Sequence, residues 1–146
     1  MKLRVFAVVC LSFAVAAPAF AGVKEKKQMK AWEKEVKSEG YYETVKSKCG
    51  AEIAFSFDAG LSKPFVESNR SLGAVANAVY REIAALCGDD DFREAITAKF
   101  KTVRFKFKKD IQYIEMGFSK KSLVAHINPT VGNTNRKARA WLEDNL

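Results

Sequence analysis

The sequence predicts an α+β fold in which a four-stranded, mostly antiparallel sheet packs in two layers against helices. Three observations predict it. Segments with apolar residues at helical spacing occur in the same chain as segments in which every second residue is apolar. Eight of the 11 phenylalanines lie between Phe55 and Phe118, where they can form one apolar core. Two cysteines outside the first 21 residues indicate one disulfide.

The first 21 residues have the composition of a secretory signal peptide. Lys2 and Arg4 precede an apolar run of about 13 residues, and small residues fill the −3 and −1 positions of a cleavage site after Ala21. The run is shorter than the roughly 20 residues of a membrane-spanning helix. Lipoprotein processing at Cys10 is disfavoured because this residue lies inside the run. We therefore expect export to the periplasm or the extracellular space, with residues 22–146 as a single domain.

Cys49 and Cys87 are the two cysteines of this domain, and in an oxidising compartment they are expected to form a disulfide. The bond would join residues 38 positions apart. The chain-entropy treatment gives it roughly 4 kcal/mol of stabilisation as an upper value. A nucleophilic cysteine paired with His126 is the disfavoured alternative, because it requires one thiol to stay free.

The predicted order is helix, strand, helix, helix, three strands, helix. The expected elements are a charged, interrupted helical segment over 22–48, a strand over 52–58, a loop over 59–68, a helix over 69–87, a short helix opened by Asp89–Asp91, strands over 102–108, 111–118 and 123–128, and a last helix from Asn133 or Thr134.

Periodicity and helix-capping residues justify these elements in turn. The first helix carries Trp32 and Val36 at helical spacing. The first strand alternates apolar and polar residues around Phe55. The long helix has a continuous apolar face, with Ser71 among its candidate caps. The aspartates that follow it are interpreted as N-terminal caps rather than as a calcium loop, because Asp89 begins no EF-hand pattern.

Two short connections predict hairpins between the last three strands. A turn at Lys109-Asp110 would pair Arg104 with Glu115, and a turn at Lys120-Lys121 would pair Glu115 with His126. These three side chains would then form one row on the polar face of the sheet. The row is either an acid–base site or a set of cross-strand charge pairs, each worth about 0.2–1 kcal/mol. We favour charge pairing, so Glu115 and His126 are only weak catalytic candidates.

A basic face on the same strands is the main candidate binding surface. Arg104, Lys106 and Lys108 alternate with phenylalanines, so the cations share one face and the aromatic rings point to the other. This separation makes nucleic-acid binding unlikely, because a stacking platform needs aromatic and cationic side chains on one face. Tyr113 is expected opposite Lys106.

A second basic cluster lies in the first turns of the last helix. Arg136, Lys137 and Arg139 oppose the helix dipole there, which hints at a partner outside the helix. The cluster is either an extension of the binding surface or a set of small, tolerated electrostatic costs. No metal site or cofactor is predicted, because the chain has a single histidine and no glycine-rich phosphate loop.

Charge and compartment together favour one function class. Removal of residues 1–21 leaves a net charge of +6, which favours anionic partners. The leading hypothesis is a non-enzymatic binding domain for an anionic polysaccharide, a lipid headgroup or an acidic protein. The alternatives are a small hydrolase or transferase that uses Glu115 and His126, and a carrier of apolar ligands between sheet and helices.

Overall fold

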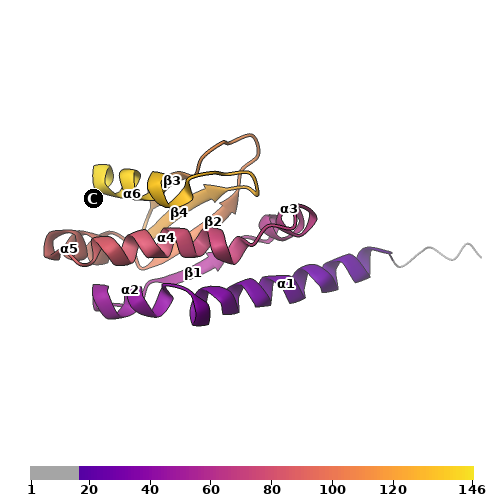
Figure 1. The fold of residues 1–146 in the computed structure, drawn as a ribbon, viewed down its shortest axis with the longest axis horizontal. Helices are drawn as coiled ribbons and strands as arrows, with labels where there is room; N and C mark the ends of the chain where they lie inside the picture. Colours follow the sequence, from indigo (N-terminus) through magenta and orange to yellow (C-terminus); the bar gives the residue numbers. More distant parts are fainter. Residues whose placement is uncertain (1–16) are drawn as a thin grey trace, which may run out of the picture.

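The computed structural model describes residues 17–146, which form one sheet and a layer of helices (Figure 1). The strands are β1 (Ala54–Phe57), β2 (Thr102–Phe107), β3 (Glu115–Ser119) and β4 (Ser122–Ile127). The helices are α1 (Ala17–Glu39), α2 (Tyr42–Cys49), α3 (Ser62–Glu67), α4 (Leu72–Leu86), α5 (Asp90–Lys99) and α6 (Thr134–Asn145), with a 3-10 turn, η1 (Ala59–Leu61), before α3. The predicted α+β class is confirmed.

The sheet is mixed, and the prediction of a mostly antiparallel sheet is wrong. Its strand order is β1-β2-β4-β3. β2 is parallel to both of its neighbours, β1 and β4, whereas β3 and β4 are antiparallel. Parallel neighbours need a long crossover connection. The chain supplies one between β1 and β2 as α3, α4 and α5.

The hairpin predicted at Lys109-Asp110 is also wrong, because β4 lies between β2 and β3. The third strand begins at Glu115 rather than at residue 111. Asn128 lies directly after β4. Its side-chain nitrogen Nδ2 donates hydrogen bonds to the backbone carbonyls of Lys108 and Ile111, in the β2–β3 connection, at 3.2 and 3.1 Å. Ile111 of this connection is buried. These contacts fix the connection against the end of β4.

All the long helices cover one face of the sheet (Figure 1). α4 is the central helix and contacts α1, α2 and α6. Alternate strand residues point toward this layer, and Val103, Phe105, Leu123 and Ile127 have no exposed surface. Their burial provides the main stabilisation of the sheet, because apolar burial contributes about 25 cal/mol per Å². The opposite face of the sheet carries none of the described helices.

The N-terminal segment forms two helices that meet at Gly40, as the interrupted pattern predicts. Gly40 lies against Asn77 of α4, where an added Cβ would be 1.8 Å from the amide oxygen. Trp32 and Val36 are buried as expected. In α2 the buried residues are Tyr42, Val45 and Cys49, whereas Tyr41, just before the helix, is exposed.

Residues 59–68 are largely helical, so the loop predicted there is wrong. Leu61 and Phe65 are fully buried and lie four residues apart, which sets one face of a helix against the core. Pro64 is tolerated because the amide hydrogens of a first helical turn lack partners within the helix. Gly60 and Pro64 locally favour a loop, but the burial of Leu61 and Phe65 outweighs this preference.

Both predicted caps of the middle helices are present. The Ser71 hydroxyl oxygen accepts a hydrogen bond from the Ala74 amide at 3.0 Å and caps α4. The Asp89 carboxylate accepts from the amides of Asp91 and Phe92 at 3.0 and 3.2 Å and caps α5. Such caps satisfy amide hydrogens that the helix itself leaves free.

The predicted disulfide is present, with a Cα–Cα distance of 5.0 Å between Cys49 and Cys87. It joins the end of α2 to the end of α4. Residues 1–16, most of the predicted signal peptide, lie outside the described residues. The predicted cleavage site after Ala21 falls within α1.

Two buried tyrosines attach β1 to the helices. The Tyr80 hydroxyl of α4 lies 2.8 Å from the carbonyl oxygen of Ile53 and 2.9 Å from that of Ala54. Its single O–H donates a hydrogen bond that these two oxygens share. The Tyr42 hydroxyl of α2 donates to the Glu52 carboxylate at 2.5 Å. Burial, together with this hydrogen bond and the carboxylate charge, raises the pKa of Tyr42 to about 12. Burial also raises the pKa of Tyr80.

Candidate functional site

The face of the sheet opposite the helices, here called the open face, carries the predicted basic strand residues. Arg104 and Lys106 of β2 are partly exposed, whereas the alternating Val103 and Phe105 have no exposed surface. This is the alternation that the sequence predicts. Lys108 follows the last residue of β2 and is exposed. The open face is therefore built by all four strands, with its cations on β2 and just beyond the end of this strand.

The row of charged side chains across this face differs from the predicted one. The β3–β4 register pairs Glu115 with His126, as predicted from the Lys120-Lys121 turn. The β2–β4 register pairs His126 with Lys106. The observed row is therefore Lys106, His126 and Glu115, and the predicted pairing of Arg104 with Glu115 is wrong. The reason is the insertion of β4 between β2 and β3.

Ion pairs engage two of the three cations. The Lys108 ammonium nitrogen lies 2.5 Å from a Glu115 carboxylate oxygen, and the Arg104 guanidinium lies 3.8 Å from a carboxylate oxygen of Asp58. All four side chains are about half exposed, so each pair contributes at most about 1 kcal/mol. Among the described residues no carboxylate lies within 4.0 Å of the Lys106 ammonium. Lys106 is thus the cation of this face that is available to a partner.

Positive charge is concentrated in the segment that contains β2 and β3, two of the strands of the open face. Residues 99–121 contain eight lysines and arginines and two acidic residues. This excess of six equals the net charge that the sequence predicts for residues 22–146 as a whole, so the rest of that range is electrically balanced. The segment runs from the end of α5 through β2 and β3 to the turn before β4.

The basic residues of α6 belong to the helical layer and not to the open face. Arg139 lies 2.6 Å from a Glu143 carboxylate oxygen and 3.8 Å from one of Glu82 in α4. Glu82 is a buried carboxylate that Arg81 also contacts, at 3.0 Å. The contact between α4 and α6 therefore explains why a basic residue stands at position 139.

Lys137 and Arg136, the other two cations of the predicted α6 cluster, have surroundings different from those of Arg139. The Lys137 ammonium lies 4.4 Å from the centre of the Tyr113 ring, a cation–π contact. Tyr113 was predicted opposite Lys106, but it lies in the β2–β3 connection, because β3 begins after it. Arg136 is exposed. The structure therefore separates the predicted binding residues into an open-face group and a helical-layer group.

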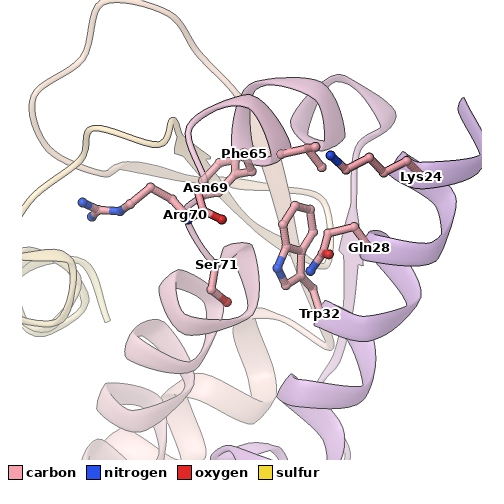
Figure 2. Close-up of a pocket in the computed structure, with 8 residues that line it drawn as sticks. Lys24, Gln28, Trp32, Phe65, Asn69, Arg70 and Ser71 are labelled. Atoms are coloured by element: carbon pink, nitrogen blue, oxygen red, sulfur yellow. The ribbon is translucent and has the colours of Figure 1, made fainter. Parts of the chain in front are cut away.

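A hollow that the sequence interpretation missed lies in the helical layer, between α1 and the α3–α4 junction (Figure 2). Its volume is about 240 Å³. It is lined by Lys24, Gln28, Trp32, Phe65, Val66, Asn69, Arg70 and Ser71. A spacing of four along α1 places Lys24, Gln28 and Trp32 on one helix face. This spacing is the feature of the sequence that predicts a shared face. By itself, however, it predicts only that Trp32 packs in the core. The packing is real, since its ring contacts Phe65 edge-on with centroids 6.1 Å apart.

Comparisons with protein-family models, with curated proteins and with solved structures found no match. Within residues 17–146, no helix combines the length and the apolar character that crossing a membrane requires. The same residues contain no group of three or more histidine, cysteine, aspartate or glutamate side chains arranged to hold a metal ion.

Proposed function

We propose that this chain is an exported, non-enzymatic binding domain whose open face contacts an anionic partner. The observation that carries the proposal is the concentration of charge in residues 99–121, with eight basic and two acidic residues. Two strands of this segment, β2 and β3, belong to the sheet face that the described helices leave uncovered. An uncovered face with a local excess of positive charge attracts anionic surfaces and raises their rate of association.

The spacing of the cations supports an extended partner. Arg104, Lys106 and Lys108 stand at alternate positions, about 6.6 Å apart for a strand rise of about 3.3 Å per residue. A row of this kind suits a chain or surface that repeats its negative charges. An anionic polysaccharide, a lipid headgroup layer and an acidic protein share this property. The partner would compete with Asp58 and Glu115 for Arg104 and Lys108, and it would meet Lys106 without such competition.

Binding can be tested with alginate, with vesicles containing phosphatidylglycerol, and with polyglutamate as three separate probes. We expect binding to at least one probe and a loss of affinity as salt rises, because salt screens exposed charges. The triple variant Arg104→Ser, Lys106→Ser, Lys108→Ser should abolish it. Binding that is independent of salt, or equal in the triple variant, would refute the proposal.

A matched control variant removes three cations elsewhere. Lys34, Lys46 and Lys48 are exposed residues of α1 and α2. Their replacement by serine changes the net charge by the same amount as the open-face triple variant. We expect this control to retain at least half of the binding signal, while the open-face variant loses it. Equal loss in both variants would show that net charge, rather than the open face, determines binding.

Export rests on the predicted signal peptide, and the Cys49–Cys87 bond is compatible with an oxidising compartment. Expression of the full chain in a bacterium followed by intact-mass analysis of the periplasmic fraction tests it. We expect a species that begins at Gly22 and is lighter than the reduced chain by two hydrogen atoms because of the disulfide. Full-length, reduced protein confined to the cytoplasm would contradict export.

An acid–base function is the second candidate, because the β3–β4 register places Glu115 directly opposite His126. Its weakness is that Lys108 already engages the Glu115 carboxylate and that both residues lie on an open strand face. Hydrolysis of a panel of ester and glycoside substrates by the wild type, abolished in Glu115→Gln with unchanged stability, would favour an enzyme. Turnover that is equal in the wild type and Glu115→Gln would exclude these residues as the catalytic pair.

A further inference from the structure

The hollow between α1 and the α3–α4 junction presents hydrogen-bond donors around an apolar wall. Phe65, Val66 and the indole ring of Trp32 form the apolar part. Gln28 and Asn69 add side-chain amides, which can donate through their nitrogen atoms. None of the eight lining residues belongs to the open face. The hollow is therefore a separate feature, and it does not depend on the function proposed above.

Trp32 provides the most specific feature of this hollow. The residue is only 4% exposed, and its ring packs against Phe65. Its indole N–H is a donor with no acceptor capacity. No hydrogen bond joins it to another described residue, and in Figure 2 the nitrogen faces the space between Trp32 and Ser71. Among the described residues the one fully buried side-chain atom without a partner is Asn77 Oδ1, so the indole N–H is open to solvent in the hollow, where the acceptor of a ligand can reach it.

The charged residues that line the hollow are both basic. Lys24 reaches over it from α1, while Arg70 stands at its far side with its guanidinium turned away (Figure 2). Glu35 of α1 is already engaged, since its carboxylate accepts a hydrogen bond from the Ser71 hydroxyl at 2.7 Å. The same carboxylate lies close to Gly73, at the start of α4. The hollow thus offers donors and positive charge together.

We propose that this hollow binds a small organic anion, a carboxylate with a compact apolar body. The carboxylate would accept from the Trp32 N–H and pair with the Lys24 ammonium, and the apolar body would lie against Phe65 and Val66. A volume of about 240 Å³ is slightly below the range of roughly 300–1,000 Å³ for drug-sized ligands. The size therefore restricts the ligand to a molecule smaller than a nucleotide.

Tryptophan fluorescence gives a direct test, because the chain has two tryptophans. In Trp141→Phe the emission comes from Trp32 alone. We use benzoate as the probe, benzyl alcohol as the same ring without the charge, and inorganic phosphate as an anion without the ring. We expect a saturable change with benzoate and affinities at least about tenfold weaker for the other two probes. No saturable change with benzoate, or equal affinity for phosphate, would overturn the proposal.

Variants then locate the bound probe. In the Trp141→Phe background, Lys24→Met should weaken benzoate binding about tenfold, because it removes the charge that pairs with the carboxylate. Lys34→Met is the matched control, since Lys34 is an exposed residue of the same helix and does not line the hollow. An equal loss in Lys34→Met would show that the effect is not local and would overturn the assignment.

A second pair of measurements separates this site from the open face. Trp32→Phe keeps a ring against Phe65 but removes the N–H, and by calorimetry it should weaken benzoate binding about tenfold in a protein of unchanged fold. The triple variant Arg104→Ser, Lys106→Ser, Lys108→Ser should bind benzoate as the wild type does. Unchanged binding in Trp32→Phe, or lost binding in the triple variant, would show that benzoate binds elsewhere.

Discussion

The two faces of β2 differ in both burial and charge. Val103 and Phe105 have no exposed surface and lie in the core beneath the helices. Arg104 and Lys106 alternate with them and lie on the open face. Apolar burial on the first face contributes strongly to stability. The exposed ion pairs on the second face contribute at most about 1 kcal/mol each. Stability and binding can therefore be changed separately on one strand.

The helical layer has additional restraints that the open face lacks. The Cys49–Cys87 bond joins α2 to α4, and hydrogen bonds from Tyr42 and Tyr80 attach the region of β1 to those helices. On the open face, the ion pairs found within residues 17–146 are those of Arg104 with Asp58 and of Lys108 with Glu115. A face that contributes little to folding tolerates substitution, so a binding surface can be built there at small cost in stability.

The sharpest test of this comparison replaces two consecutive residues of β2. Phe105→Ala should lower the free energy of unfolding by about 3–5 kcal/mol, because it leaves a cavity in a fully buried site. Lys106→Ala should change it by no more than about 0.5 kcal/mol. Urea denaturation followed by circular dichroism measures both values. Similar losses for the two variants would show that the open face is also part of the stabilising core.

Removal of the disulfide is expected to have the next largest effect. Replacing Cys49 and Cys87 by alanine should cost about 2–4 kcal/mol, because the bond closes a separation of 38 residues in the unfolded chain. The same urea experiment measures the change. The open-face triple variant, tested beside it, should lose less than half as much. A negligible effect of the double alanine variant would mean that packing between α2 and α4 alone holds the helical layer together.

A smaller effect is expected at Gly73, where α1 approaches α4 closely. A Cβ at this position would be 2.4 Å from a Glu35 carboxylate oxygen, so Gly73→Ala must displace that side chain and its hydrogen bond with Ser71. We expect a loss of about 1 kcal/mol in the free energy of unfolding.

The Glu35→Ala background provides the control for this change. Without the carboxylate, the higher helix propensity of alanine, up to about 1 kcal/mol, is opposed only by the contact of 3.1 Å with the remaining Cβ of residue 35. The loss of stability caused by Gly73→Ala should therefore be smaller in this background. Equal effects in a double-mutant cycle would show that Glu35 does not determine the requirement for glycine at position 73.

The last effect concerns pH and the Tyr42–Glu52 hydrogen bond. Burial and the neighbouring carboxylate raise the pKa of Tyr42 from its ordinary value of 10.0 to about 12 in the folded protein. The folded state thus holds the phenolic proton more tightly than the unfolded state. The corresponding stability is complete below pH 10 and is lost as the pH rises through about 12.

The measurement compares the wild type with Tyr42→Phe between pH 9 and pH 12. We expect the free energy of unfolding to fall more steeply in the wild type than in Tyr42→Phe. The variant should keep a residual dependence, because burial also raises the pKa of Tyr80. Identical pH profiles would show that the Tyr42 hydroxyl does not contribute to this loss.

Much of the local structure could be predicted, because it depends on residues close together in the chain. Alternation in β2 correctly predicted that Arg104 and Phe105 point to opposite faces. The Asp89 cap and the β3–β4 hairpin register were predicted for the same reason. The disulfide followed from the number of cysteines in the predicted mature chain.

The order of strands was decided only by tertiary structure. Local spacing favoured a β2–β3 hairpin, but β4 pairs with both strands, and Asn128 fixes the β2–β3 connection beside it. The donor-lined hollow arises in the same way, since Lys24 and Trp32 meet Asn69 only when α1 packs beside α3. The sequence by itself determined which side of each strand is apolar, because side-chain alternation is local. Which strands become neighbours depends on long-range burial, and that decided which charges share the open face.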